Sequence, residues 1–260
     1  MNRRALLGTV GAMVSMGTLT YTTRDPVETL EIGVWLSEAA ARYARVEERI
    51  VEYLECVCGF DYWSLSVSVR GVVRVSTEDG ALVTSSGEWP TMVFDGALGR
   101  GSIDPAADVN LLVTDGQMHQ TPTGYALPHI GSVGGARYLA TLEPYDELVG
   151  ADPPVSVEDA TVPISTPVRT MQVLIHEVGH TLGLAHDHGV ASVQDGVVVA
   201  TPMISTYAFD PDYEVDCSRC GGPYPDTHNR PRKLSLAFST CARRDLRQYS
   251  GGLRLRTDRR

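Results

Sequence analysis

Three histidines and a glutamate lie within eleven residues, at a spacing that can bind a metal ion and activate water. His176 and His180 are four residues apart, so on a helix both imidazoles share a face and can reach one ion. Glu177 directly follows the first histidine. It therefore projects to the side of the ion, where it can take a proton from bound water. This pattern predicts hydrolysis at a zinc ion.

A glycine and the third histidine complete the pattern. Gly183 can adopt the left-handed conformation that ends a helix in a sharp turn. His186, three residues later, can then return to the ion as a third ligand. Three protein ligands leave one position open for water, which distinguishes a catalytic zinc site from a closed structural one. His188 is interpreted as a loop residue beside the site, with ligation as the alternative.

The motif, with Asp187 directly after the third histidine, resembles that of the metzincin zinc endopeptidases, and most closely that of the adamalysin or reprolysin branch. Met203 lies seventeen residues after His186, where metzincins carry a methionine in a tight turn beneath the zinc. Residues 238–246 are similar to the start of the reprolysin C-terminal helix. The resemblance covers about residues 165–249.

Some features depart from the family pattern. Astacins and serralysins have a tyrosine two residues after the Met-turn methionine, whereas here Tyr207 is four residues on, so its role is not carried over. The rich cysteine framework of animal reprolysins is missing, which indicates a minimal prokaryotic member. Lys233 is the sole lysine and the net charge is −10. This composition fits a haloarchaeal source, or equally a GC-rich genome that favours arginine codons.

The resemblance implies a secreted endopeptidase with one catalytic zinc ion. Zinc would lower the pKa of its bound water, and Glu177 would take the proton and later protonate the leaving amine. A polypeptide substrate would lie extended along an edge strand expected around residues 135–142. Met203 is expected to support the site from below, and Asp187 to fix the loop from outside the ligand sphere.

Other functions remain open. A hydrolase of a non-peptide or cell-wall amide would use the same attack, and only the cleft walls would distinguish it. A zinc-bearing binding protein without proteolytic activity would typically lack Glu177, which is present. Calcium is an additional cofactor that no pattern supports, although three acidic loop residues are candidates: Asp210, Asp212 and Glu214.

The order of elements predicts an α+β fold of two lobes. The N-terminal lobe, to about residue 183, would hold a mixed twisted sheet, packed helices and the active-site helix. A small irregular C-terminal lobe, from about residue 184, would carry the Met-turn and a closing helix. The expected elements are strands at 29–37, 64–69 and 108–114, a helix at 38–56, a glycine-rich turn then a strand within 125–142, a loop at 143–164, a helix capped by Thr166 and running to Leu182, and a helix at 241–249.

Length and composition fit one compact catalytic domain over residues 27–249, expected to be a monomer: the chain has 260 residues, 43% of them apolar. The acidic net charge argues against binding nucleic acid. Residues 1–22 read as a signal peptide, because Arg3 and Arg4 precede a short apolar run. Twin-arginine and ordinary secretion both suit it, and no stable membrane span is expected. Residues 250–260 are expected to form a flexible basic tail.

Five cysteines in an exported protein favour disulfides and leave at least one thiol unpaired. The resemblance implies that Cys241 is bridged, with Cys217 or Cys220 as its near partner in sequence. The alternative is a structural zinc site built from two close pairs of cysteines, Cys56 with Cys58 and Cys217 with Cys220.

Overall fold

The computed structural model describes most of the chain outside its ends. The described residues are 25–118, 122–150, 161–204, 220, 225 and 230–252. The expected signal peptide and nearly all of the expected tail lie outside them, so both remain predictions. In these ranges no helix is long and apolar enough to cross a membrane.

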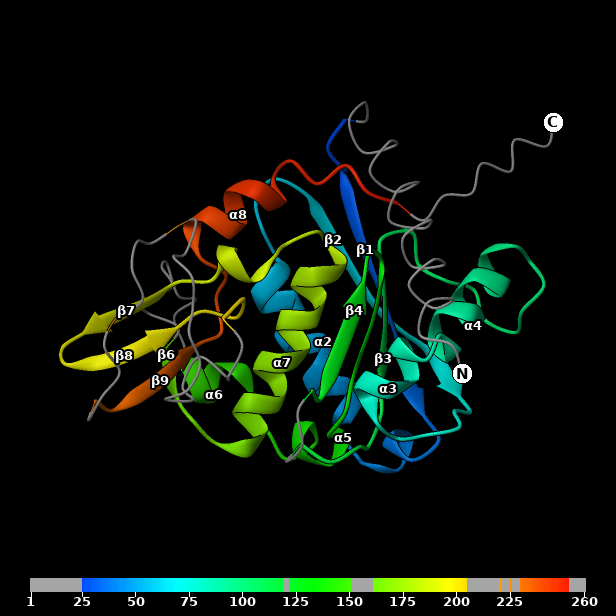
Figure 1. Cartoon of the computed structure of the whole chain (residues 1–260), viewed down its shortest axis with the longest axis horizontal. Helices are drawn as coiled ribbons and strands as arrows, with labels where there is room; N and C mark the ends of the chain where they lie inside the picture. The colour runs from blue at the N-terminus through cyan, green and yellow to red at the C-terminus, as the bar shows by residue number, and fades with distance from the viewer. Residues whose placement is uncertain are drawn as a thin grey trace, which may run out of the picture.

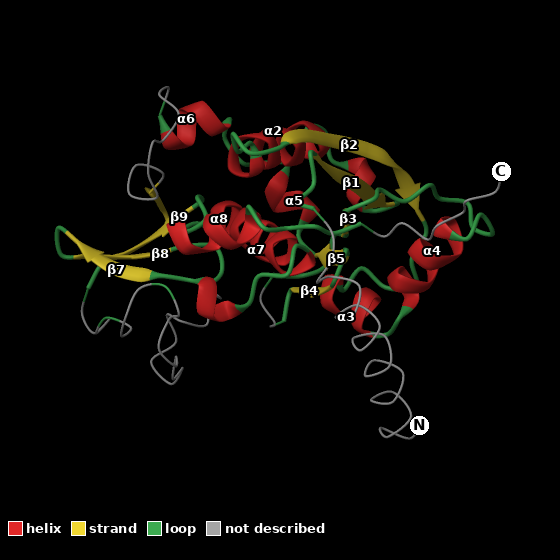
Figure 2. Ribbon diagram, turned by 90° about the horizontal axis from the view of Figure 1, so that it is seen from above, coloured by secondary structure: helices red, strands yellow, loops and turns green. Residues whose placement is uncertain are grey.

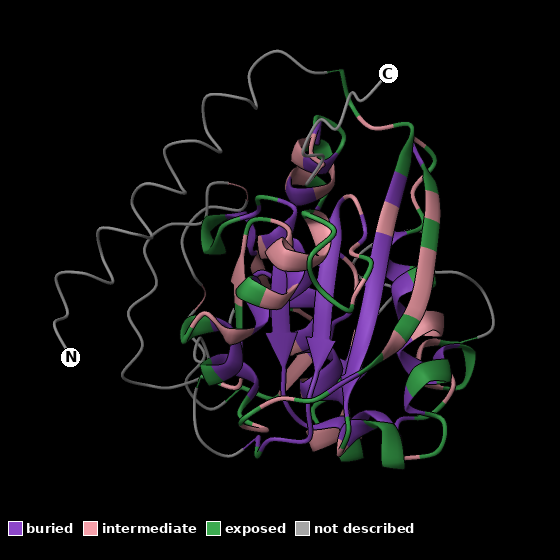
Figure 3. Cartoon of the chain, turned by 90° about the vertical axis from the view of Figure 1, so that its right-hand side faces the viewer, coloured by how far each residue is buried: buried purple, intermediate pink, exposed green. Residues whose placement is uncertain are grey.

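A five-stranded sheet forms the centre of the molecule (Figure 1). Its strand order is β2 (Ser64–Val73), β1 (Thr29–Ser37), β3 (Val109–Val113), β5 (Ile130–Val133) and β4 (Gly124–Leu127). The first four strands are parallel, whereas β4 runs antiparallel to β5 and forms an edge. The three strands predicted before residue 115 are confirmed, and the inner strands are largely buried (Figure 3).

Helices cover both faces of this sheet (Figure 2). On one face, α2 (Val46–Cys58) and α7 (Thr166–Thr181) bury alternate side chains of β1. On the other face lie α3 (Gly80–Ser85) and α4 (Glu88–Ala97). The indole of Trp35, which points to this second face, packs against α4. The structure is therefore a mixed α and β fold, and α7 is held within its main core.

The helix predicted over residues 38–56 begins later than expected. A 3₁₀ turn at Ala40–Arg42 comes first, and the N–H of its first residue donates to Ser37 Oγ at 3.0 Å. Arg45 then takes a left-handed conformation with φ 66°. This conformation interrupts a right-handed helix, so α2 starts one residue later.

Between residues 125 and 142, the predicted order of a turn followed by a strand is wrong. Strands β4 and β5 come first, joined by a turn in which His129 has φ 70°. Gly135, with φ 82°, follows the hairpin and precedes the short helix α5 (Ala136–Leu139). The left-handed glycine ends the hairpin, and the residues directly after it are helical rather than extended.

A second, smaller sheet contradicts the expected loop at 143–164 and the expected irregular C-terminal lobe. The loop contains α6 (Tyr145–Val149) and β6 (Thr161–Pro163). The second sheet has the order β6, β9 (Arg232–Ser235), β8 (Val197–Ala200) and β7 (Ala191–Gln194). The closing helix is confirmed as α8, over Thr240–Leu246.

The β7–β8 hairpin has a local cause in the sequence. Asp195 and Gly196 connect its strands, with φ values of 49° and 81°. An Asp-Gly pair favours a two-residue turn with positive φ at both positions, which matches the twist of a hairpin. The signal was therefore present in the sequence, although the strands beside it are only four residues long.

The histidine-bearing helix α7 starts at Thr166, one residue earlier than expected, and a different residue caps it. The hydroxyl of Ser165 accepts a hydrogen bond from the backbone N–H of Val168 at 3.3 Å. Pro167 occupies the first turn, where its missing N–H has no partner to lose. Thr166 is therefore the first helical residue rather than the cap.

We expect Ser165→Ala to lower the free energy of unfolding by about 1 kcal/mol, because an N–H at the helix start loses its acceptor. Thr166→Ala is the matched control, since the Thr166 side chain does not cap, and it should change stability by clearly less. Urea unfolding of both variants measures this difference. Equal losses, or a larger loss for Thr166→Ala, would contradict the assignment of the cap.

Candidate metal centre

The three histidines of the motif come together at the end of α7, whose course Figure 1 shows. His176 and His180 lie one turn apart on α7, and His186 opens the 3₁₀ turn His186–His188 that follows. One ring nitrogen from each lies within 4.8 Å of the other two. Among the described residues this is the single cluster of His, Cys, Asp and Glu side chains that meets this spacing.

Backbone carbonyls fix the tautomers of the first two histidines. His176 Nδ1 lies 2.8 Å from Pro202 O, and His180 Nδ1 lies 2.8 Å from Leu184 O. A carbonyl oxygen only accepts, so each Nδ1 must carry a proton. In the neutral rings both Nε2 atoms therefore present lone pairs, and they face each other at 2.9 Å. A cation bound to both would relieve this contact.

A zinc ion fits this donor set. Three imidazoles without a thiolate are a known ligand set for catalytic zinc, and a backbone carbonyl on Nδ1 is the usual partner behind such a ligand. Burial, and after it the neighbouring His180, lowers the pKa of His176 to about 3. Burial also lowers the pKa values of His180 and His186. The rings are thus kept in the neutral form that binds metal.

A left-handed glycine brings the third histidine back to the helix end. Gly183 has φ 92°, and nothing lies within 4 Å of the position that a Cβ would take. Its role is therefore conformational rather than steric. Beyond it, the N–H of Leu184 donates to Gly179 O at 2.9 Å, which closes the helix end. The ring of His186 is the most exposed of the three.

The carboxyl group of Glu177 is buried and incompletely paired. Its Oε2 has no hydrogen-bond partner in the described part of the chain. Burial raises the pKa of Glu177 to about 8. The edge strand β4 passes so close that a Cβ on Gly124 would lie 2.7 Å from Glu177 Oε1. Gly124 was not identified from the sequence, because only the folded structure brings it to α7.

A cleft of about 370 Å³ lies over the histidines. Strand β4 and the residues flanking it form one wall and α7 forms the other; the lining residues are 122–128, Gln172, Val173, His176, Glu177, His180 and His186. The edge strand of the cleft is therefore β4, and the expectation that residues 135–142 form it is wrong. Those residues contain α5, which follows the left-handed Gly135.

Met203 lies in the turn beneath α7, and a second residue that sequence reasoning missed holds that turn. The sulfur of Met203, which is buried, would lie 2.3 Å from a Cβ on Gly179, so helix and turn are in direct contact. Gln172 Nε2 donates to Pro202 O and Ile204 O, each at 2.9 Å. The sequence signal was a polar residue four positions before His176, on the same helix face.

The structure places Asp187 and His188 on the turn of the third histidine. The Asp187 side chain is about half exposed, and its Oδ1 lies 3.2 Å from His188 Nδ1. His188 is buried, and both of its ring nitrogens bond to other residues of the protein. His188 does not belong to the cluster of converging ligand atoms.

The cysteines form one disulfide in the described part of the chain, Cys220–Cys241. This pairing is one of the two that the resemblance implied for Cys241. Because Cys220 is in the bridge, it cannot contribute to a four-cysteine zinc site. Cys56 is exposed and Cys58 buried, both as thiols, while Cys217 lies outside the described residues.

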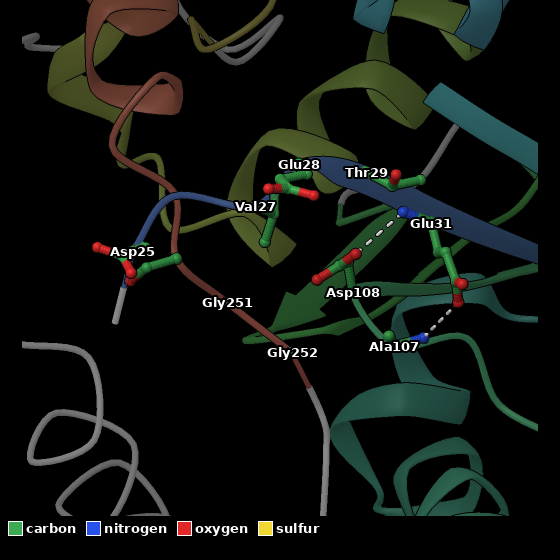
Figure 4. Close-up of a pocket in the computed structure, with 10 residues that line it drawn as sticks. Asp25, Val27, Glu28, Thr29, Glu31, Ala107, Asp108, Gly251 and Gly252 are labelled. Carbon is green, nitrogen blue, oxygen red and sulfur yellow. Dashed lines mark hydrogen bonds between the residues drawn. The ribbon is translucent and has the colours of Figure 1, made fainter. Parts of the chain in front are cut away.

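The calcium candidates at residues 210–214 also lie outside the described residues. A separate acidic cavity of about 580 Å³ lies between the start of β1 and the residues after α8 (Figure 4). Two of its carboxylates accept hydrogen bonds: the N–H of Glu31 donates to Asp108 Oδ2 at 2.9 Å, and the N–H of Ala107 donates to Glu31 Oε2 at 3.2 Å. Among the described residues, the acidic side chains of this cavity do not form a converging group of metal ligands.

Gly183→Ala should lower the free energy of unfolding by about 1 kcal/mol, because a Cβ disfavours the left-handed conformation. Gly183→Asn should cost less, since asparagine tolerates that conformation better. Thermal and urea unfolding of the metal-free protein would measure both. If alanine were as stable as glycine, the conformational role assigned to this position would be wrong.

No model of a known protein family matches the chain, and no curated protein matches it. Among solved structures, the chain is similar to the crystal structure of a zinc-dependent peptidase from Methanocorpusculum labreanum (strain Z), with 16% identity and a TM-score of 0.30. The match covers 60% of this chain and 82% of that chain. At this TM-score the likeness says nothing about activity, which has to be inferred from the histidine cluster.

Proposed function

We propose that the protein is a zinc-dependent endopeptidase, with His176, His180 and His186 as zinc ligands and Glu177 as general base and acid. The observation that carries the proposal is the close pair of Nε2 atoms on rings whose Nδ1 protons are fixed by carbonyls. The chemistry that a bound zinc ion supplies is Lewis acidity, which polarises a carbonyl group and makes water acidic near neutral pH.

Glu177 would move the proton. Burial raises its pKa in the metal-free protein, and a bound zinc ion would favour the carboxylate form, which can accept a proton. Oε2, which has no partner among the described residues, is the atom available to accept a proton from the attacking water. The same group would then protonate the departing amine. The backbone of Gly124 limits the movement of the carboxyl group on the side of β4.

The edge strand favours a peptide over other amide substrates. Strand β4 pairs with β5 on one side, and it lines the cleft with the residues that flank it. A strand edge offers backbone N–H and C=O groups that an extended peptide can pair with. A cell-wall or small-molecule amide would use little of this surface, so hydrolysis within polypeptides is the activity that the cleft supports best.

We further infer a metzincin relative of reprolysin type, in which Met203 supports the ligands from below and Asp187 steadies the turn. Three observations support this inference: the bend at Gly183, the buried turn against Gly179, and the bridged Cys241. The disulfide also supports export, since such bonds persist in oxidising compartments. Secretion from a signal peptide at residues 1–22 belongs to the same proposal.

The decisive experiment compares cleavage of casein by the zinc-loaded protein and by Glu177→Gln, over a salt series. We expect wild type to cut internally and chelation to abolish cutting. Glu177→Gln should lose at least about 100-fold in rate, the range of general acid–base catalysis, while it still binds one zinc. Glu55→Gln, at an exposed position of α2, is the matched control. Zinc binding without any peptide cleavage would favour an amide hydrolase of another class or a binding protein.

Gly124→Ala should lower the turnover number by about tenfold to a hundredfold, because a methyl group would displace the Glu177 carboxyl group. Zinc affinity should stay unchanged, since the nearest atoms to the added methyl group all belong to Glu177. Steady-state kinetics on a peptide found from the casein cuts, together with zinc titration, separate the two effects. An unchanged turnover number would show that the close approach of β4 does not position the base.

A further inference from the structure

The third histidine is held differently from the first two. The rings of His176 and His180 each bond a backbone carbonyl through Nδ1. The ring of His186 contacts the other two rings, but it has no hydrogen-bond partner within the described ranges. Its orientation therefore depends on the backbone of the 3₁₀ turn on which it lies.

His188, two residues later, stabilises that turn through hydrogen bonds to Ala185. Its Nδ1 accepts the N–H of Ala185 at 2.9 Å, and its own backbone N–H donates to Ala185 O at 3.0 Å. Because Nδ1 accepts, the ring proton lies on Nε2. The His188 side chain is about 5% exposed, so these bonds are protected from water.

Asp245 in the C-terminal helix and Ser239 at its N-cap form hydrogen bonds with His188. His188 Nε2 donates to Asp245 Oδ2 at 3.0 Å, and Ser239 Oγ, at the cap of α8, donates to His188 O at 2.8 Å. These partners lie 57 and 51 residues further along the chain. The Cys220–Cys241 disulfide joins the same helix to residue 220.

We propose that His188 and Asp245 are positioning residues that hold the third zinc ligand through α8. The inference rests on the proposed zinc site. Without the hydrogen bond between His188 and Asp245, the first two ligands would stay in place but the turn that carries His186 would become mobile. Zinc would then bind more weakly and dissociate faster. Partners bonded directly to a metal ligand typically contribute tenfold to a hundredfold in affinity. His188 and Asp245 act through the backbone of the turn, so we expect the lower end of that range.

The test uses Asp245→Ala and Asp245→Asn in the full chain. Alanine removes the acceptor and is itself a good helix former, so α8 is not weakened by propensity. Asparagine keeps an oxygen that can accept from His188 Nε2. Gln248→Ala, an exposed position just after α8, is the matched control. Zinc affinity is measured by competition with a chromophoric chelator, well below the unfolding temperature, together with the rate of zinc transfer to excess chelator and the absorption spectrum of the Co²⁺ form.

Asp245→Ala should raise the zinc dissociation constant by about tenfold or more, speed zinc release and change the Co²⁺ spectrum. Asp245→Asn should stay closer to wild type, and Gln248→Ala should match it. Wild-type affinity and spectrum in Asp245→Ala would overturn the proposal, even if its melting temperature fell, because a purely structural role would affect only stability. Failure of wild type to bind zinc would instead overturn the proposed function.

Discussion

Two backbone carbonyls determine how the histidines can be used. Pro202 O and Leu184 O accept from the Nδ1 atoms of His176 and His180, which leaves two Nε2 lone pairs in contact. Burial disfavours placing a proton between them, because a charged imidazole would lose its hydration. A metal cation satisfies both lone pairs at once. Leu184 lies directly after the end of α7, and Pro202 lies in the turn that packs against this helix. The path of the backbone therefore determines which nitrogen of each ring carries the proton.

The same helix carries a buried carboxyl group, one oxygen of which has no hydrogen-bond partner among the described residues, at a cost in stability. Glu177 is buried beside β4 with one oxygen unsatisfied in the described structure, an arrangement that lowers stability. A core chosen for stability alone would place an apolar side chain there. The wall opposite has Gly124, whose missing side chain makes room for the carboxyl group. Both residues depart from what packing favours, as expected where function outweighs local stability.

The features that could be predicted from the sequence are those that depend on residues close together in the chain. The four-residue spacing predicted that His176 and His180 lie on one face of a helix. The position of Gly183 after the helical pattern predicted its left-handed conformation. The sequence also located β1 with its observed bounds. In contrast, the cleft wall was misplaced, because the short strands around His129 give a weaker pattern than the glycines after them. Gln172 and Gly124 matter only through contacts with distant segments, which periodicity does not reveal.

The proposed ligand set is uneven, because different parts of the chain hold its three rings. His176 is buried, His180 partly buried and His186 exposed, and within the described residues the first two rings, unlike the third, bond a backbone carbonyl through Nδ1. The turn of the third is fixed by a helix that ends more than fifty residues later. The His176 ring is likewise held from 26 residues further along, by Pro202 O. A complete three-histidine site therefore requires the C-terminal segment to be folded, which links the ability to hold a metal to the integrity of the whole domain.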